Sequence, residues 1–396
     1  MRIVLVADTF PPLRSSGAVQ LRDLSLEFVR QGHETTVILP APELRTPWLI
    51  EERDGVRVLR LRSPPTKDVS YFRRAVHEAI MPLSMMRNLR RSPLGIESWD
   101  GVVWYSPTIF LGPFAHMLRI RSECRGYLVV RDIFPEWAYD MGLMGRGLPY
   151  AIFKTVASYQ YFVADVIGVQ TKGNLDYFRR WQGRRGRRVE VLPNWLGVAA
   201  TDACAIRIEN TPLSGKHVFV YAGNMGVAQG MDILLDLAER LRARDDVGFL
   251  FVGRGSEFAR MRALAETRGL TKVMFHDEIH PDHIPGLFAQ CSAGVVALDS
   301  RHKSHNIPGK FLTYMQSGLP VLANVNRGND LAELIRTERV GEVCESNSID
   351  ELRAKAESLL LDIRSDMSLS DRCRGLFRRE FAVEKTVRQI VKGLSV

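Results

Sequence analysis

The residues best suited to bind phosphate lie in turns that contain glycine. The richest turn spans Tyr221 to Gly230 (Tyr-Ala-Gly-Asn-Met-Gly-Val-Ala-Gln-Gly). It holds three glycines and two side-chain amides, namely Gly223, Gly226, Gly230, Asn224 and Gln229. Glycines let a backbone approach a ligand closely, and amides offer hydrogen-bond donors, so we expect a diphosphate or a sugar here. The spacing is neither the Gly-x-Gly-x-x-Gly of dinucleotide binding nor the Gly-Lys-Ser/Thr of a P-loop.

A second turn, Asn306-Ile-Pro-Gly-Lys310, carries a positive charge. Pro308 and Gly309 precede a predicted helix of about eight residues, which leads into a strand. Lys310 in the first turn of that helix would add its ammonium to the positive end of the helix dipole. Together they suit a diphosphate leaving group, whose negative charge develops as the bond to it breaks. The alternative interpretation is a surface lysine near a helix start.

A third turn, Pro11-Pro-Leu-Arg-Ser-Ser-Gly17, lies directly before a helix that is predicted from about Ala18 to Arg30. Gly17 at the start of this helix would allow close approach of an anion. A glycine before a helix is also an ordinary turn, so this segment alone does not define a site.

Short apolar runs alternate with amphipathic stretches over nearly the whole chain, which predicts parallel sheets covered by helices. The predicted strands of the first half are 3–6, 35–39, 102–104, 127–130 and 165–169. After linker-like residues 197–215, the alternation resumes with strands at 218–221, 248–252, 273–276, 294–298, 320–323 and 342–344. We therefore predict two doubly wound Rossmann-like domains, 1–196 and 197–377, facing across a cleft. Ligands of such sheets bind beyond the carboxyl ends of the strands.

The composition is that of a globular protein, with 45% hydrophobic and 25% charged residues among 396. No stretch approaches the roughly 18 uninterrupted apolar residues of a membrane-spanning helix. The N-terminal apolar run is too short for a signal peptide. Five scattered cysteines without a Cys-x-x-Cys pair indicate reduced thiols and a cytoplasmic location rather than a disulfide framework or a zinc site.

Two basic clusters account for much of the net charge of +9. Residues 60–95 hold eight Arg or Lys against two acids, and residues 178–188 hold six Arg and no acid. Residues 71–92 also alternate apolar and basic side chains, which predicts an amphipathic pair of helices on an anionic membrane, broken at Pro82. A core-packing helix with arginines that reach the solvent, or a solvated basic face, explains the same pattern.

Several of these segments resemble the retaining glycosyltransferases of family 4, which have the GT-B fold. The matching motifs are Phe10-Pro-Pro…Gly17, Gly32-His-Glu-Thr-Thr-Val-Ile38, Leu192-Pro-Asn-Trp195 and Phe251-Val-Gly-Arg-Gly255. Two further segments, 223–230 and Arg131-Asp-Ile-Phe-Pro-Glu136, are similar to those of bacterial surface-polysaccharide transferases, in particular N-acetyl-L-fucosamine transferases of O-antigen assembly. The resemblance extends over almost the full chain.

The resemblance implies roles for the domains and for particular residues. The second domain would bind a nucleotide-sugar donor, taken as a UDP-sugar, and the first an acceptor, taken as a lipid-linked glycan. A C-terminal helix within 378–396 would cross back to the first domain. Gly17 would approach the donor phosphates, and Gly253 would belong to the substrate-binding set. Arg131 would replace a histidine near the reacting sugar, with Asp132 beside it.

The sequence departs from the family pattern at positions that normally hold the donor. Asn224 and Gln229 replace an arginine and a lysine of the diphosphate clamp, so Lys310 would supply part of the missing charge. The family's paired glutamates correspond to His305 and Thr313, and Thr313 offers a single hydroxyl to the ribose. Glu333 is a candidate for compensating this loss.

The expected reaction is retaining, metal-independent transfer at the inner face of the cytoplasmic membrane, with no cofactor and no nucleic-acid partner. Attack from the front face, with a donor phosphate oxygen as the base, is what the family resemblance implies. No Asp-x-Asp occurs, and His276, His280 and His283 are interpreted as surface residues because prolines interrupt them. Two other functions remain open, a nucleotide-sugar epimerase and a non-catalytic scaffold of the same fold.

Overall fold

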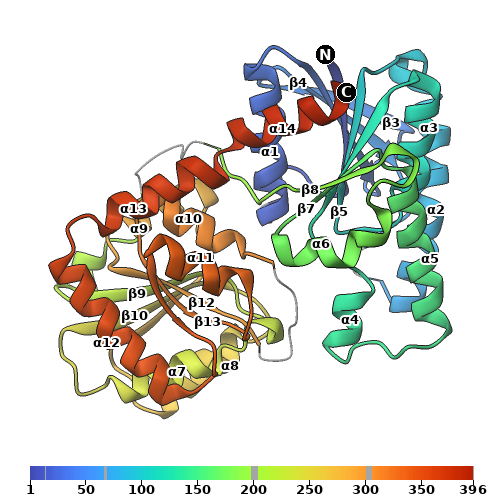
Figure 1. The fold of residues 1–396 in the computed structure, drawn as a ribbon. Helices are drawn as coiled ribbons and strands as arrows, with labels where there is room; N and C mark the ends of the chain where they lie inside the picture. The colour runs from blue at the N-terminus through green and yellow to red at the C-terminus, as the bar shows by residue number, and fades with distance from the viewer. Residues whose placement is uncertain (14, 67–68, 198–203, 300–305, 396) are drawn as a thin grey trace. The chain divides into compact units, whose positions relative to one another are not determined.

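A computed structural model of the chain describes residues 1–13, 15–66, 69–197, 204–299 and 306–395. The chain forms two compact units, which Figure 1 shows by colour along the sequence. Unit 1 comprises Met1–Gly197 and Val383–Val396, and unit 2 comprises Val198–Ala382. Residues 378–382 of the predicted crossover segment therefore belong to unit 2. Only the helix α14 (Val383–Ser395) returns to unit 1.

Unit 1 is built on a sheet whose described strands follow the order β3-β4-β2-β1-β5-β6-β7-β8. They are β1 (Arg2–Val6), β2 (Glu34–Ala41), β3 (Trp48–Arg53), β4 (Val56–Arg62), β5 (Gly101–Ser106), β6 (Arg125–Val130), β7 (Val166–Val169) and β8 (Arg188–Val191). The strands pair in parallel, except that β3 runs antiparallel to β4. The central strand β5 is buried along its length because both faces of the sheet carry helices.

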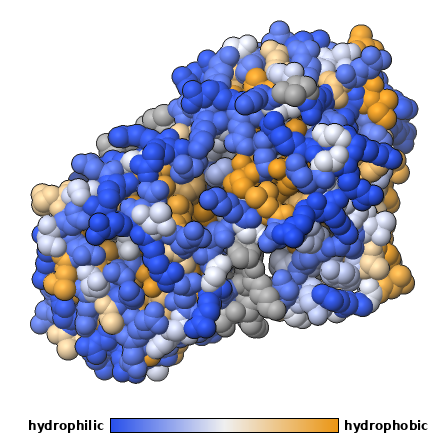
Figure 2. Space-filling view, in the orientation of Figure 1, coloured by the Kyte–Doolittle hydropathy of each residue, from blue (hydrophilic) through white to orange (hydrophobic). Residues whose placement is uncertain are grey.

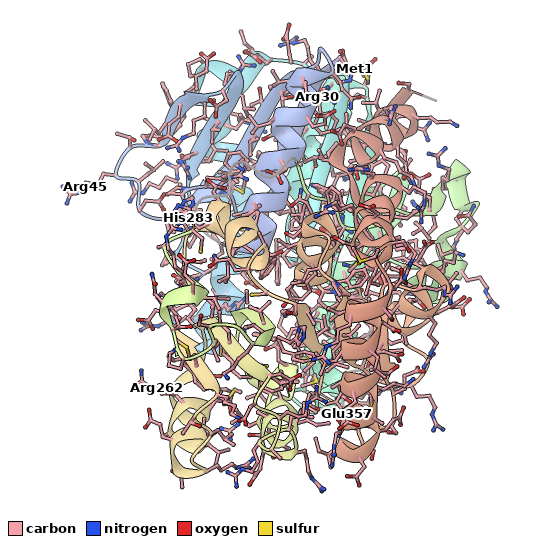
Figure 3. The ribbon with its side chains drawn as sticks, turned by 90° about the vertical axis from the view of Figure 1, so that its left-hand side faces the viewer. Met1, Arg30, Arg45, Arg262, His283 and Glu357 are labelled. Carbon is pink, nitrogen blue, oxygen red and sulfur yellow. The ribbon has the colours of Figure 1, made fainter. Side chains whose placement is uncertain are left out.

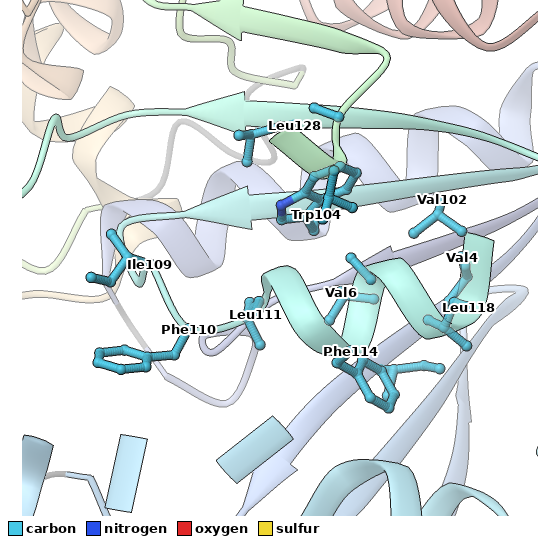
Figure 4. Packing of buried hydrophobic residues seen from close by; sticks show 14 of the residues in the cluster. Val4, Val6, Val102, Trp104, Ile109, Phe110, Leu111, Phe114, Leu118 and Leu128 are labelled. Atoms are coloured by element: carbon cyan, nitrogen blue, oxygen red, sulfur yellow. The ribbon is translucent and has the colours of Figure 1, made fainter. Parts of the chain in front are cut away.

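Two groups of helices cover the two faces of this sheet. On one face, α1 (Ser16–Arg30) and α14 enclose Leu5, Tyr127 and Trp195. On the other, α2 (Tyr71–Leu89), α3 (Gly112–Ser122) and α5 (Leu148–Val163) pack on a second core. Figure 4 shows this core, where Leu118 of α3 lies beside Val4 of β1. The short helices α4 (Glu136–Asp140) and α6 (Lys172–Phe178) follow β6 and β7.

Three features of unit 1 differ from the sequence prediction. Residues 71–89 form one helix with Pro82 inside it, so the predicted break at this proline is wrong. Proline removes one hydrogen bond of the helix, but Met81 and Met85 on the same turns are buried in the core and hold the helix together. The hairpin β3–β4 was not predicted, and neither was β8, which begins inside the arginine-rich segment.

Unit 2 has a parallel sheet with the order β11-β10-β9-β12-β13-β14 in the part of the chain that is described. Its strands are β9 (His217–Asn224), β10 (Val247–Arg254), β11 (Val273–His276), β12 (Ala293–Ala297), β13 (Val321–Asn324) and β14 (Gly341–Cys344). The order reverses between β9 and β12, and such a switch point is where doubly wound sheets bind ligands. In unit 1 the reversal lies at β1, between β2 and β5.

The helices of unit 2 lie around this sheet (Figure 1). They include α7 (Asp232–Arg240), α8 (Phe258–Thr267), α9 (Ile284–Phe288), α10 (Gly309–Ser317), α11 (Asp330–Glu338), α12 (Ile349–Ser365) and α13 (Leu369–Leu376). Leucines of α7 and α12 fill the core beneath Phe219 and Phe249. Charged side chains such as Arg262 of α8 and Glu357 of α12 point outward (Figure 3), as expected for amphipathic helices.

Candidate active site

The turn that follows β9 is held in shape by its own side chains. The amide oxygen of Gln229 accepts a hydrogen bond from the Gly226 nitrogen at 2.9 Å, across the 3₁₀ turn Val227–Gln229. The Tyr221 hydroxyl donates to the Asn224 carbonyl oxygen at 2.6 Å. The amide oxygen of Gln229 is therefore used within the turn, and its NH₂ group is available to donate to a ligand.

Lys310 lies over the end of β9, although 86 positions separate it from Asn224 in the chain. Its ammonium nitrogen is 4.6 Å from the centroid of the Tyr221 ring. A Cβ on Gly223 would lie 3.7 Å from the Lys310 Cε. No carboxylate of the described residues forms an ion pair with this ammonium. The structure thus brings together Lys310 and the turn, which the sequence could indicate only separately.

The N-terminus of α10 adds to the positive character of this place. The helix begins at Gly309, one residue earlier than predicted, and its cap residue Pro308 provides no side-chain hydrogen bond to the first turn. Backbone N–H groups at a helix start that lack a cap carry a partial positive charge and attract anions. Lys310 projects from this same turn. A helix terminus and an ammonium at the switch point of the sheet form a site suited to a diphosphate.

Two glycines at the end of β10 lie where any side chain would collide with the backbone of the neighbouring turn. A Cβ on Gly253 would come within 1.9 Å of the Gly223 carbonyl oxygen, and one on Gly255 within 2.3 Å of the Met225 oxygen. The backbone at Gly253 also has φ +151°. These glycines allow β10 to lie against the turn after β9. Gly253 therefore shapes the site through backbone packing, which is a role that the motif alone did not specify.

The residues considered for ribose binding lie on different helices. The Thr313 hydroxyl donates to the Gly309 carbonyl oxygen at 3.3 Å, one turn earlier in α10, so its lone pairs are what it offers a ligand. Glu333 is exposed in the first turn of α11. His305 lies outside the residues that the structure describes.

Gly17 sits at the switch point of unit 1, in the first turn of α1. A Cβ at this position would be 3.3 Å from the Thr9 Cγ2 and 3.4 Å from the Tyr105 hydroxyl. The Ser15 hydroxyl caps the helix by accepting from the Ala18 nitrogen at 3.3 Å. The glycine therefore keeps this turn close to the carboxyl ends of β1 and β5.

Arg131 follows β6 and is buried, whereas the neighbouring Asp132 is exposed. The guanidinium donates to the carbonyl oxygens of Leu192 and Pro193, at 2.9 and 3.4 Å, and lies 4.5 Å from the Trp195 ring centroid. Burial lowers the pKa of Arg131 to about 10. These contacts of Arg131 hold the segment after β8 against the sheet. Of the two neighbouring residues, Asp132 is the one whose side chain is accessible.

Tyr221 is a residue of the site that sequence reasoning missed. Its ring lies beneath the Lys310 ammonium, and cation–π attraction favours that placement. The available signal was an aromatic residue at the end of a predicted strand, directly before Ala-Gly-Asn. Such a residue is usually assigned to the core, and Tyr221 is indeed buried.

The described residues contain no cluster of side chains that could bind a metal ion. Among residues 1–13, 15–66, 69–197, 204–299 and 306–395, no group of three or more His, Cys, Asp or Glu side chains is placed to hold an ion. The histidines His280 and His283 lie near one another, with ring centroids 5.9 Å apart, but they form no such group.

Comparison with known proteins agrees with this fold. Residues 216–362 match the family model for glycosyl transferases group 1. The chain is 24% identical over 358 residues to the putative colanic acid biosynthesis glycosyl transferase WcaI of Escherichia coli K12, covering 84% of this chain and 85% of that protein.

Solved structures share the fold along nearly the whole chain. Sucrose-phosphate synthase from Thermosynechococcus elongatus has a TM-score of 0.76 at 15% identity, covering 99% of this chain and 98% of that one. Anabaena HepE in complex with UDP-glucose has a TM-score of 0.68 at 15% identity, covering 99% of each chain. The fold is therefore GT-B, with two Rossmann-like domains. Together with the family match over unit 2, it defines the chain as a glycosyltransferase resembling group 1.

Proposed function

We propose that this glycosyltransferase moves a sugar from a UDP-sugar to a lipid-linked glycan, with retention of configuration and without a metal ion. The observation that carries the proposal is the position of Lys310 over the turn after β9, at the switch point of unit 2. An ammonium that no described carboxylate neutralises suits a diphosphate leaving group. The UDP-glucose bound by HepE supports the choice of nucleotide.

In the proposed mechanism, unit 2 binds the donor and unit 1 the acceptor. The ammonium of Lys310 and the N–H groups at the start of α10 stabilise the diphosphate as the sugar departs. Asn224 and the NH₂ group of Gln229 donate hydrogen bonds to the donor. Thr313 and Glu333 are proposed to contact the ribose. A donor phosphate oxygen accepts the proton of the attacking hydroxyl.

Unit 1 contributes the acceptor side of this proposal. Gly17 lies near the carboxyl end of β1, and its proposed role toward the donor phosphates rests on the family resemblance. Asp132 is exposed at the end of β6 and would orient the acceptor hydroxyl. Arg131 would act indirectly, since its guanidinium is bound to backbone carbonyls. The catalytic roles of Asp132 and Arg131 are proposals that rest on the family resemblance.

We further propose a place in surface-polysaccharide assembly, either of lipopolysaccharide O-antigen or of capsule. The colanic acid assignment of the relative supports a polysaccharide product. The sugar that we propose to be transferred is an N-acetylated deoxy sugar, as in N-acetyl-L-fucosamine transfer. Its acceptor would be at the cytoplasmic face of the membrane, where the protein would associate peripherally. None of the described helices is both long and apolar enough to cross a bilayer.

One assay separates the proposed transfer from its two alternatives. The purified protein is incubated with a panel of UDP-sugars, with and without a lipid-linked glycan, in the presence and absence of EDTA. Transfer predicts release of UDP that depends on acceptor and is unchanged by EDTA. Interconversion of the donor without acceptor would indicate an epimerase, and donor binding without turnover a scaffold. Analysis of the anomeric configuration of the product tests retention.

A further inference from the structure

The outer face of α5 carries an exposed apolar stripe. Its large side chains are Leu148, Ile152, Tyr159 and Phe162, which are 74%, 52%, 39% and 39% exposed. At about 100° per residue, these four positions and Thr155 fall within an arc of about 80° on the helix. The opposite side of α5 is fully used, because Ala157 and Tyr161 are buried in the core of unit 1. Within the stripe, the Tyr159 hydroxyl is hydrogen-bonded to His116 of α3 at 2.6 Å, and Leu148 and Ile152 are its most exposed side chains.

The stripe belongs to a wider layer of helices on one face of the sheet. α2, α3 and α5 all pack on the same core, with α3 in contact with both of the others. The layer also exposes Leu83 of α2 and Ile120 of α3. Figure 2 shows apolar surface along the right-hand edge, over α3, α2 and α5. These side chains add to the apolar character of the layer that carries the stripe.

An arginine lies near each end of the α5 stripe. Near its start, the guanidinium of Arg146 lies 4.5 Å from the Tyr139 ring centroid. At its end, the guanidinium of Arg185 lies 4.5 Å from the Phe162 ring centroid. The sequence from 141 to 164 contains no Asp or Glu, and neither does that from 177 to 189. An apolar stripe with aromatic residues, arginines at its ends and no acids is complementary to a membrane interface with anionic headgroups.

We infer that the α5 stripe, defined as Leu148, Ile152, Tyr159 and Phe162, docks unit 1 on an anionic bilayer. This inference deepens the proposed function, since it rests on an acceptor that is anchored in lipid. The connection from β6 to β7 contains α4 and then α5, and α5 leads directly into the start of β7. The N-terminus of α5 therefore lies toward the carboxyl edge of the sheet, where Asp132 follows β6. Leu148 would thus contact the bilayer at the end of α5 that is nearer to the proposed acceptor side.

Vesicle binding tests the inference. The full-length double variant Leu148→Gln with Ile152→Gln is compared with wild type in flotation with vesicles of phosphatidylcholine, with and without phosphatidylglycerol. We expect binding to vesicles that contain phosphatidylglycerol to fall at least about tenfold, because two side chains lose their transfer into the interface. The control, Leu361→Gln with Met367→Gln, changes two apolar residues of unit 2 that are 65% and 90% exposed, and it should bind as wild type does.

A second variant tests the charges. Arg146→Gln with Arg185→Gln should lose most of the preference for phosphatidylglycerol, since each arginine near an anionic surface adds attraction. Undiminished binding of both variants would overturn the inference. It would also be overturned if the apolar variant bound vesicles normally but changed from dimer to monomer in sedimentation, because the stripe would then contact a second copy.

Failure of this inference can be told apart from failure of the proposed function. Thermal unfolding of the variants should match that of wild type, because the changed side chains are exposed. Consumption of UDP-sugar with a detergent-dispersed acceptor should also be unchanged. If wild type consumed no donor at all while the vesicle difference persisted, the proposed function would be wrong and the docking surface would stand.

Discussion

The Lys310 ammonium lies 4.6 Å from the centroid of the Tyr221 ring, at the end of the strand that precedes the glycine-rich turn. This contact joins the two candidate phosphate-binding segments of unit 2, which are the turn at 221–230 and the turn at 306–310. The ring fixes the direction of a flexible side chain without neutralising its charge. The positive charge is therefore held in place before a donor binds, which reduces the cost of ordering it during the reaction.

Removal of the Lys310 charge should slow the reaction more than it weakens donor binding. For Lys310→Ala we expect turnover to fall by about 10²-fold, the usual effect of losing one group that stabilises developing negative charge. Steady-state rates of UDP release measure it. The control is Lys216→Ala, because Lys216 precedes β9 at its opposite end and bonds to the Asp245 carbonyl. Equal rates for Lys310→Ala and wild type would contradict the proposed role.

A side chain at Gly253 should separate β10 from the turn after β9. In Gly253→Ala the new Cβ would meet the Gly223 carbonyl oxygen at 1.9 Å, so the backbone must move. We expect a loss of donor affinity and a destabilisation of about 2–4 kcal/mol from the clash and the unfavourable φ. Calorimetric titration with UDP and thermal unfolding measure the two effects. Gly215→Ala has a positive φ but no atom within 4 Å, and it should cost about 1 kcal/mol without affecting UDP binding.

Substitution of Arg131 should destabilise unit 1. Arg131→Met leaves the carbonyl oxygens of Leu192 and Pro193 without their donor, at a cost of about 3 kcal/mol. Denaturant unfolding measures this loss, with Arg179→Met on the exposed surface as the control. A variant that unfolds like wild type but has lost turnover would instead favour direct participation of Arg131 in the reaction.

The arginines at the end of α2 should contribute to membrane binding through charge alone. Arg87, Arg90 and Arg91 are exposed. Changing all three to Glu should weaken binding to anionic vesicles by about 1 kcal/mol or more per position, since attraction becomes repulsion. Flotation at rising salt measures the effect, and the difference from wild type should shrink as screening increases. Undiminished binding at low salt would count against a role of these side chains.

The sequence by itself determined the class of fold and the location of the candidate phosphate-binding turns. Apolar strand runs such as 218–221 and 248–252 are long enough and regular enough to be predicted, because a strand buried on both faces must be apolar throughout. The start of α10 at Gly309 and the turn after β9 follow from local signals of glycine and proline, which act through backbone geometry.

Features that depend on packing between residues far apart in the sequence were decided by the tertiary structure alone. Pro82 stays inside α2 because Met81 and Met85 are buried, and burial depends on neighbours far away in the sequence. β8 begins at Arg188, the last residue of the arginine-rich segment, and forms because it completes the edge of a sheet. Lys310 and Tyr221 are 89 positions apart in the chain, and only the parallel arrangement of β9 and β12 places one over the other. Local residue preferences determine where helices and strands form, whereas the candidate site arises from how those helices and strands pack together.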